Sequence, residues 1–163
     1  MHRTLLALFL LFAVSPAWSA LQIDVTEGVS GALPIAIVPF GGNTGLQLDV
    51  AEVVDNDLAS TGLFKTLPRG DMIEKPTSAA EVTYGNWRGV QVDNVVVGNI
   101  QSLSDGGYKL RFEILDVYKG GKIGGFELTA RSGATLRYTA HKVADLIYEK
   151  LTGLKGVFTT RIA

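Results

Sequence analysis

Three short apolar stretches of the chain predict strands of a sheet. Residues 34–40 are almost wholly apolar and short, which is typical of a strand buried on both faces, and residues 94–100, with three consecutive valines, predict a second buried strand. Residues 63–69 predict another short strand, because apolar and aromatic residues are followed there by Pro68. These stretches place a sheet with a buried centre in the middle of the fold.

A strict alternation of apolar and charged residues predicts a hairpin in residues 108–130. The residues 119–122, Lys-Gly-Gly-Lys, are typical of the turn between its two strands, and Phe126 and Leu128 share one face of the returning strand. On the first strand, one face carries Tyr108, Leu110, Phe112 and Ile114, and the other carries Lys109, Arg111 and Glu113. The hairpin is therefore expected to have one buried face and one polar face.

Apolar residues at helical spacing predict two main helices. In the first, Leu46, Val50, Val54 and Leu58 recur every four residues, and Gly62 ends the pattern. The second is expected over residues 134–151, with Gly153 as its cap; its apolar positions are Leu136, Ala140, Val143, Ile147 and Leu151. A brief helix near residues 79–90 is expected to turn Val82 and Trp87 inward.

The order of these elements predicts the fold class. Strand, helix, strand, helix, three strands, helix and strand follow one another along the chain. This order favours an α/β fold: a single two-layer domain with a mixed β-sheet packed by two main helices. The final strand is expected over residues 157–162, which are rich in β-branched and aromatic residues.

The first residues match the three-part pattern of a secretory signal peptide. Arg3 precedes an apolar run over residues 5–14, which is too short for a bilayer span of ~20 residues. Ala17 and Ser19 are the small residues that signal peptidase requires, so cleavage is expected between Ser19 and Ala20. The alternative, a buried N-terminal helix, is disfavoured because no polar residues alternate with the apolar ones.

Residues 20–31 are expected to form an arm ahead of the domain. Alternate apolar and polar residues suit a strand that adds to the sheet of a partner, and Gly28 and Gly31 offer a hinge before Pro34. The alternative is a permanent edge strand of the protein's own sheet. The candidate binding residues of the arm are Ala20, Leu21, Gln22, Ile23, Asp24, Val25, Thr26, Glu27 and Gly28.

Composition narrows the class of protein. The chain has 163 residues, no cysteine and a net charge of -1. An exported chain without cysteine has neither disulfides nor a lipid-acceptor cysteine, which favours a soluble protein of a bacterial periplasm with no membrane insertion of the mature chain. The absence of a basic patch argues against a nucleic-acid partner.

Candidate catalytic and metal-binding residues are few. One histidine, His141, remains after the signal peptide, and it favours a surface or packing role over that of a base. No catalytic residue, cofactor or metal site is therefore expected. The carboxylates of the first helix favour a solvated face over a cation site; they are Asp49, Glu52, Asp55 and Asp57.

A glycine-rich loop over residues 41–45 follows a buried strand and precedes a helix, the place of a phosphate-binding loop. Gly41, Gly42 and Gly45 match neither of the two nucleotide-binding glycine patterns, which favours an ordinary turn. The alternative function, a periplasmic ligand- or nucleotide-binding α/β domain that uses Gly41 to Gly45, stays open on the residues alone.

Four stretches resemble the N-terminal domain of the TolB family. They are "PIAIVPFGG", "DLASTGLFKTLPR", "VDNVVVGNI" and, most specifically, "YEKLTGLKGVFTTRIA". The resemblance implies a signal peptide over residues 1–19, the arm over residues 20–31, the N-terminal domain over residues 32–155, and the start of a truncated β-propeller over residues 156–163.

The resemblance also implies a function. TolB-like proteins are non-enzymatic periplasmic adaptors of the Tol-Pal system of Gram-negative bacteria. The arm is expected to bind TolA at the inner membrane, and the missing propeller to bind the outer-membrane lipoprotein Pal. The system supports outer-membrane integrity and constriction at cell division, and colicins exploit it for import.

Overall fold

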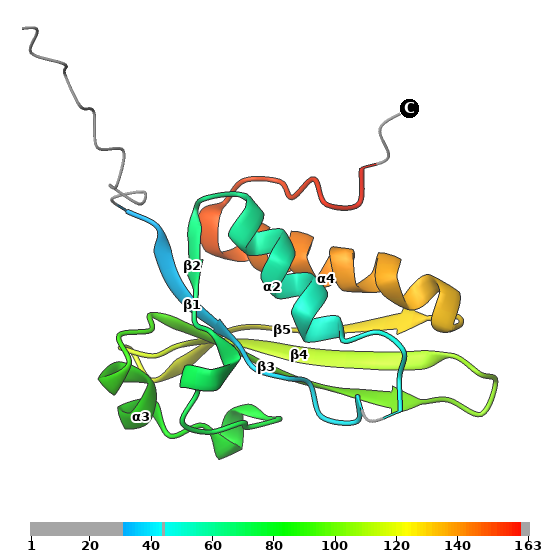
Figure 1. Ribbon diagram of the computed structural model, residues 1–163, viewed down its shortest axis with the longest axis horizontal. Helices are drawn as coiled ribbons and strands as arrows, with labels where there is room; N and C mark the ends of the chain where they lie inside the picture. The colour runs from blue at the N-terminus through cyan, green and yellow to red at the C-terminus, as the bar shows by residue number, and fades with distance from the viewer. Residues whose placement is uncertain (1–30, 44, 161–163) are drawn as a thin grey trace, which may run out of the picture.

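The computed structural model describes residues 31–43 and 45–160 and contains a five-stranded mixed sheet (Figure 1). The strands lie in the order β2-β1-β3-β4-β5, with β1 parallel to β2 and β3, and with β3, β4 and β5 antiparallel. They are β1 (Leu33–Ile37), β2 (Phe64–Thr66), β3 (Asn94–Ser102), β4 (Tyr108–Asp116) and β5 (Gly121–Ala130). The expected hairpin is thus present, with the register Phe112↔Phe126.

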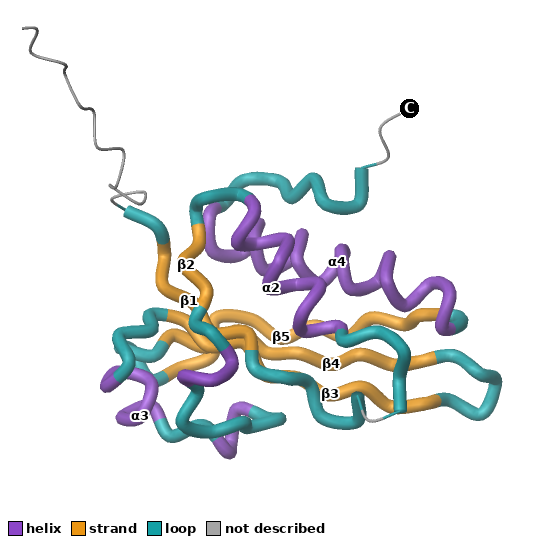
Figure 2. Tube along the Cα trace, viewed as in Figure 1, coloured by secondary structure: helices purple, strands orange, loops and turns teal. Residues whose placement is uncertain are grey.

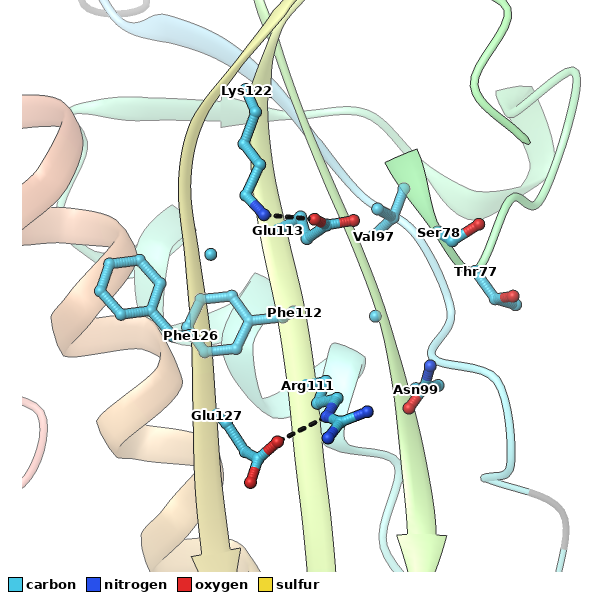
Figure 3. A pocket seen from close by; sticks show the side chains of 12 residues that line it. Thr77, Ser78, Val97, Asn99, Arg111, Phe112, Glu113, Lys122, Phe126 and Glu127 are labelled. Carbon is cyan, nitrogen blue, oxygen red and sulfur yellow. Dashed lines mark hydrogen bonds and ion pairs between the residues drawn. The ribbon is translucent and has the colours of Figure 1, made fainter. Parts of the chain in front are cut away.

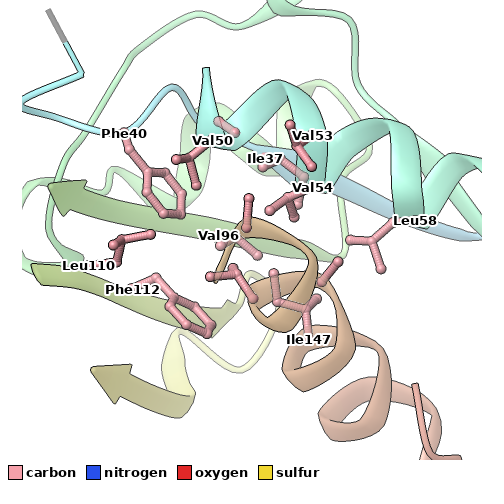
Figure 4. Close-up of a cluster of buried hydrophobic side chains, with 14 of the residues drawn as sticks. Ile37, Phe40, Val50, Val53, Val54, Leu58, Val96, Leu110, Phe112 and Ile147 are labelled. Carbon is pink, nitrogen blue, oxygen red and sulfur yellow. The ribbon is translucent and has the colours of Figure 1, made fainter. Parts of the chain in front are cut away.

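Two helices, α2 (Val50–Ser60) and α4 (Gly133–Thr152), cover one face of the sheet (Figures 1 and 2). Asp49 caps α2 by accepting the Glu52 N–H at 3.1 Å, and Gly153 ends α4 in the left-handed conformation at φ 74°. The apolar stripes of both helices meet alternate residues of the strands in the main core (Figure 4). The predicted α/β fold with a mixed sheet and two main helices is confirmed.

The segment between β2 and β3 covers part of the other face of the sheet. It contains the 3-10 turns η2 (Arg69–Asp71) and η3 (Ala79–Glu81) and the short helix α3 (Tyr84–Gly89). Trp87 of α3 is 1% exposed in a second core, as predicted, and its indole N–H donates to Glu74 Oε1 at 2.6 Å. Glu74 also accepts the Thr83 N–H and an Asn86 side-chain N–H, so one carboxylate organises this cover.

The first helix begins later than the pattern of apolar residues predicted. Leu46 packs against the main core, yet α2 starts only at Val50. The difference has a local cause, because the Asp49 carboxylate satisfies a free N–H of the first turn and thereby fixes the start. Apolar periodicity alone does not contain this signal.

The predicted strand over residues 157–162 is wrong for the residues described there. Residues 157–160 form a turn, and residues 161–163 lie outside the described residues. The Phe158 N–H donates to a carboxylate oxygen of Asp145 on α4 at 2.8 Å, instead of to a neighbouring strand. A side chain of the preceding helix thus accepts the hydrogen bond that the predicted strand would have given to a neighbouring strand.

Candidate functional site

The candidate arm and the cleavage site lie outside the described residues. This holds for Ser19 and for all of residues 20–28, so their binding role stays a prediction. Near the first described residue, Gly31, the Leu33 N–H donates to Leu63 O at 2.8 Å where β1 joins β2. The described part of the chain therefore begins next to the edge strand β2.

The glycine loop extends the sheet. The Gly41 N–H donates to Gly98 O at 2.9 Å, and Gly41 O accepts the Ile100 N–H at 2.8 Å. Gly42 has φ 73° and lies so close to the backbone of Ile100 that no Cβ would fit there. Backbone pairing and close packing account for these two glycines.

The N-terminus of α2 does not offer the free positive end that a phosphate requires. The Asp49 carboxylate occupies it, and Arg69 Nη1 lies 2.6 Å from Asp49 Oδ2. The hydrogen bond from Arg69 holds the pKa of Asp49 below its usual value, so the carboxylate is charged at neutral pH. The end of the helix dipole is therefore already occupied by a carboxylate of the protein itself.

The acidic residues of α2 are engaged within the domain more than the sequence predicted. Besides Asp49, Asp55 accepts a hydrogen bond from the Thr66 hydroxyl at 3.3 Å, and burial raises the pKa of Asp55. Asp57 Oδ2 lies 2.6 Å from His141 Nδ1. Of these four carboxylates, only Glu52 fits the expected solvated face, because its side chain is exposed. Among the described residues, no three His, Cys, Asp or Glu side chains gather closely enough to hold a metal ion.

His141 connects the two helices that cover the sheet. Its ring nitrogen faces Asp57, and the side chains of His141 and Asp57 are 27% and 17% exposed. Both residues lie at the boundary between α2 and α4, so their contact joins the helices at a half-buried position. The arrangement matches the packing role that the sequence favoured for this histidine.

A polar pocket of about 380 Å³ lies on the side of the sheet that carries the alternating charges (Figure 3). Lys122 Nζ lies 2.6 Å from Glu113 Oε1, and Arg111 pairs with Glu127. Glu113 also accepts the Ala79 N–H at 3.0 Å, which connects the sheet to the segment that covers it. The hydrogen bond from Lys122 holds the pKa of Glu113 below its usual value, so this carboxylate stays ionised and paired.

The pocket follows from the predicted alternation of the hairpin and from one glycine. Gly125 lies opposite Glu113, and a Cβ at Gly125 would come within 2.6 Å of Lys122 Nζ. Without that Cβ, the Lys122 side chain of β5 can pass over Gly125 and reach Glu113 on β4. The alternation predicted a polar face, but the ion pairs across strands depend on the register of β4 and β5, which the sequence did not contain.

Known proteins share this domain. The family model described as the TolB amino-terminal domain matches residues 21–123, from the expected arm to the start of β5. The chain belongs to the TolB amino-terminal domain family. The predicted resemblance is therefore confirmed.

Curated TolB proteins and a solved TolB structure support the same family. The Tol-Pal system protein TolB of Xanthomonas euvesicatoria is 41% identical over 162 residues, which cover 98% of this chain and 37% of that protein. The TolB of Xanthomonas oryzae is 42% identical over 146 residues, 88% of this chain and 33% of that protein. TolB from Acinetobacter baumannii has a TM-score of 0.67 at 28% identity and covers 78% of this chain and 30% of its own.

The matched length and the described helices are both limited. The chain spans about a third of the length of the curated TolB relatives it matches. None of the helices that the structure describes is long and apolar enough to cross a membrane.

Proposed function

We propose that this chain is the partner-binding front part of a non-enzymatic, periplasmic adaptor of the Tol-Pal system. The observation that carries the proposal is the 41% identity, over 98% of the chain, to proteins named Tol-Pal system protein TolB. The paired state of the polar groups supports a binding role over a catalytic one. Asp49, Asp57 and Glu113 each bind a basic or imidazole side chain within the domain.

In this proposal, residues 20–28 of the arm bind TolA. Leu21, Ile23 and Val25 alternate with polar residues, so an extended arm can add to a sheet edge of TolA through its backbone and place apolar side chains on one face. The first strand that the structure describes begins at Leu33. The arm can therefore be removed without loss of any described element.

The remaining parts of the proposal concern the longer protein. Pal is bound through a C-terminal propeller of the kind that the resemblance implies, so Pal binding is not assigned to residues 20–163. Support of outer-membrane integrity, constriction at division and use by colicins follow from membership of the Tol-Pal system.

All of these roles require the mature chain to be in the periplasm, after cleavage between Ser19 and Ala20. Intact-mass analysis of the periplasmic protein should therefore give a mature N-terminus at Ala20.

The test is deletion of residues 20–26 in the otherwise complete chain, with binding measured against the purified C-terminal domain of TolA. We expect binding to be lost and the melting temperature to stay within a few degrees of the parent value, since the contacts described among residues 31–160 do not involve the deleted residues. Unchanged TolA binding would refute the role of the arm. A collapse of the fold would instead favour the alternative that the arm is a permanent edge strand.

Matched substitutions within the arm sharpen this test. Serine at Leu21, Ile23 and Val25 removes the apolar face, whereas serine at Gln22, Asp24 and Thr26 leaves it intact. We expect the first triple variant to lose TolA binding and the second to keep most of it, because backbone hydrogen bonds are shared and the apolar side chains give specificity. Equal loss in both variants would contradict one-sided binding.

A further inference from the structure

The chain does not leave the domain as a free linker after α4. We call residues 153–160 the connector. It begins with the left-handed Gly153, and the Leu154 N–H then donates to Thr152 Oγ1 at 3.1 Å. In Figure 1 the connector, drawn in red, runs back along the outside of the helix layer. The turn at Gly153 thus returns the chain toward the helix it has just left.

Asp145 holds the connector two turns before the end of α4. Its Oδ1 accepts the Phe158 N–H at 2.8 Å, and its Oδ2 accepts the Thr159 hydroxyl at 2.7 Å. Both acceptors belong to one carboxylate, so these hydrogen bonds are charge-assisted and stronger than neutral ones. They join residues that are 13 and 14 positions apart in the chain.

Aromatic contacts fix the same part of the connector to the main core. The ring of Phe158 meets the ring of Tyr148 edge-on, with centroids 5.9 Å apart at 84°. Tyr148 lies 6.0 Å from Phe64 of β2. Phe158 is therefore partly buried and packs against the core, whereas its neighbour Val157 is 66% exposed.

Gly156 lets the connector approach the helix closely. A Cβ at this residue would lie 2.6 Å from Cα of Asp145, a separation that real Cβ atoms essentially never show. Any side chain here forces the connector away from α4 without removing one of its hydrogen-bonding groups. The connector is thus held to α4 by close packing at Gly156, by the ring of Phe158, and by the hydrogen bonds of Phe158 and Thr159 to Asp145.

We propose that the docked connector is a positioning device: it fixes the place and direction in which the chain leaves the domain, and Asp145 is its positioning residue. A flexible linker of this length would let the following residues sample many directions. A connector held at Gly156, Phe158 and Thr159 instead keeps its own end in one place beside α4. The inference does not depend on TolA binding, because none of these residues belongs to the arm.

Paired spin labels test this proposal in the complete chain. The protein has no cysteine, so cysteines introduced at Asn56 on α2 and at Val157 on the connector, both exposed, are the only labelling sites. We expect a single narrow distance distribution between the labels in the parent chain. Asp145→Ala should broaden it, and Glu149→Ala, an exposed carboxylate one turn further along α4, should leave it narrow.

A steric variant separates docking from the stability of the domain. Gly156→Ala should broaden the same distribution although every hydrogen-bonding group remains, whereas Gly133→Ala, with open space around its Cα, should not. Amide exchange by NMR gives an independent readout. The Phe158 amide should exchange about tenfold faster or more in Asp145→Ala, while amides of β3 keep their protection.

Two results would overturn the proposal. One is a broad distance distribution and a rapidly exchanging Phe158 amide in the parent chain. The other is a distribution that stays narrow in both Asp145→Ala and Gly156→Ala. TolA binding should be the same in all these variants, so failure of this inference and failure of the proposed arm function give different results.

Discussion

The two faces of the sheet are stabilised in different ways. The face under α2 and α4 is apolar across the strands, and its core includes Ile37, Val96 and Phe112. The opposite face is apolar only beneath the cover of residues 67–92, where Trp87 packs, and it then changes to the ion pairs of β4 and β5. The first face is stabilised by apolar area removed from water, and the second combines a smaller apolar core with a few hydrogen-bonded polar groups.

This difference indicates which changes the domain tolerates. A large side chain removed from the helical face leaves a cavity in a close-packed core. A charge removed from the open end of the other face returns its partner to solvent at little cost. The loss of Glu74 should have an intermediate cost, because it would leave the indole N–H of the buried Trp87 without an acceptor.

The largest expected effect is on the helical face. Phe112 is 1% exposed and stacks on Phe126 with ring centroids 5.1 Å apart. Phe112→Ala should lower the free energy of unfolding, measured by urea denaturation, by about 3–5 kcal/mol. Tyr118→Ala, at a residue 58% exposed, is the control and should change it by less than about 0.5 kcal/mol. Similar losses in the two variants would remove the distinction between core and surface.

An intermediate effect is expected at the cover of the other face. Glu74→Ala leaves the Trp87 indole N–H and the Thr83 N–H without their acceptor. The free energy of unfolding should therefore fall by about 1–3 kcal/mol. The tryptophan fluorescence should also shift as its surroundings loosen. Lys75→Ala, at the exposed next residue, should show neither change. An unchanged Glu74→Ala protein would mean that apolar packing alone holds the cover.

The smallest effect is expected in the polar pocket, and it should depend on pH. The pKa of Glu113 is held low chiefly by the hydrogen bond from Lys122, so its contribution to stability is present above the unfolded pKa of about 4.3 and is lost as the pH falls through the folded value. Glu113→Gln should cost about 1 kcal/mol or less at pH 7. The difference from the parent chain should vanish by acidic pH, and a difference that persists below the folded pKa would show that the ion pair is not its cause.

The sequence predicted the parts of the fold that depend on periodicity. Alternation placed Lys109, Arg111 and Glu113 together on one face, and four-residue spacing identified the buried side of α2. Positions that depend on contacts between distant residues were missed. The local sequence pattern predicts neither the contact between Asp57 and His141 of the two helices nor the three hydrogen bonds that Glu74 accepts.

The chain end shows the same limit most clearly. Residues 157–162 have the composition of a strand, and composition measures only suitability for a half-buried pleated surface. Asp145 offered a closer partner to Phe158 than any strand of the sheet does. The local preference was overridden by one carboxylate on a neighbouring helix.

The sequence by itself determined the class of fold, the two helices with their buried stripes, the glycine cap at Gly153 and the family. These features follow from residue type and short-range spacing, which the chain carries wherever it folds. The tertiary structure decided the start of α2, the ion pairs across β4 and β5, and the course of the connector. Each of these rests on a hydrogen-bonded or charged partner whose position is fixed only when distant segments pack together, and no local pattern records that partner.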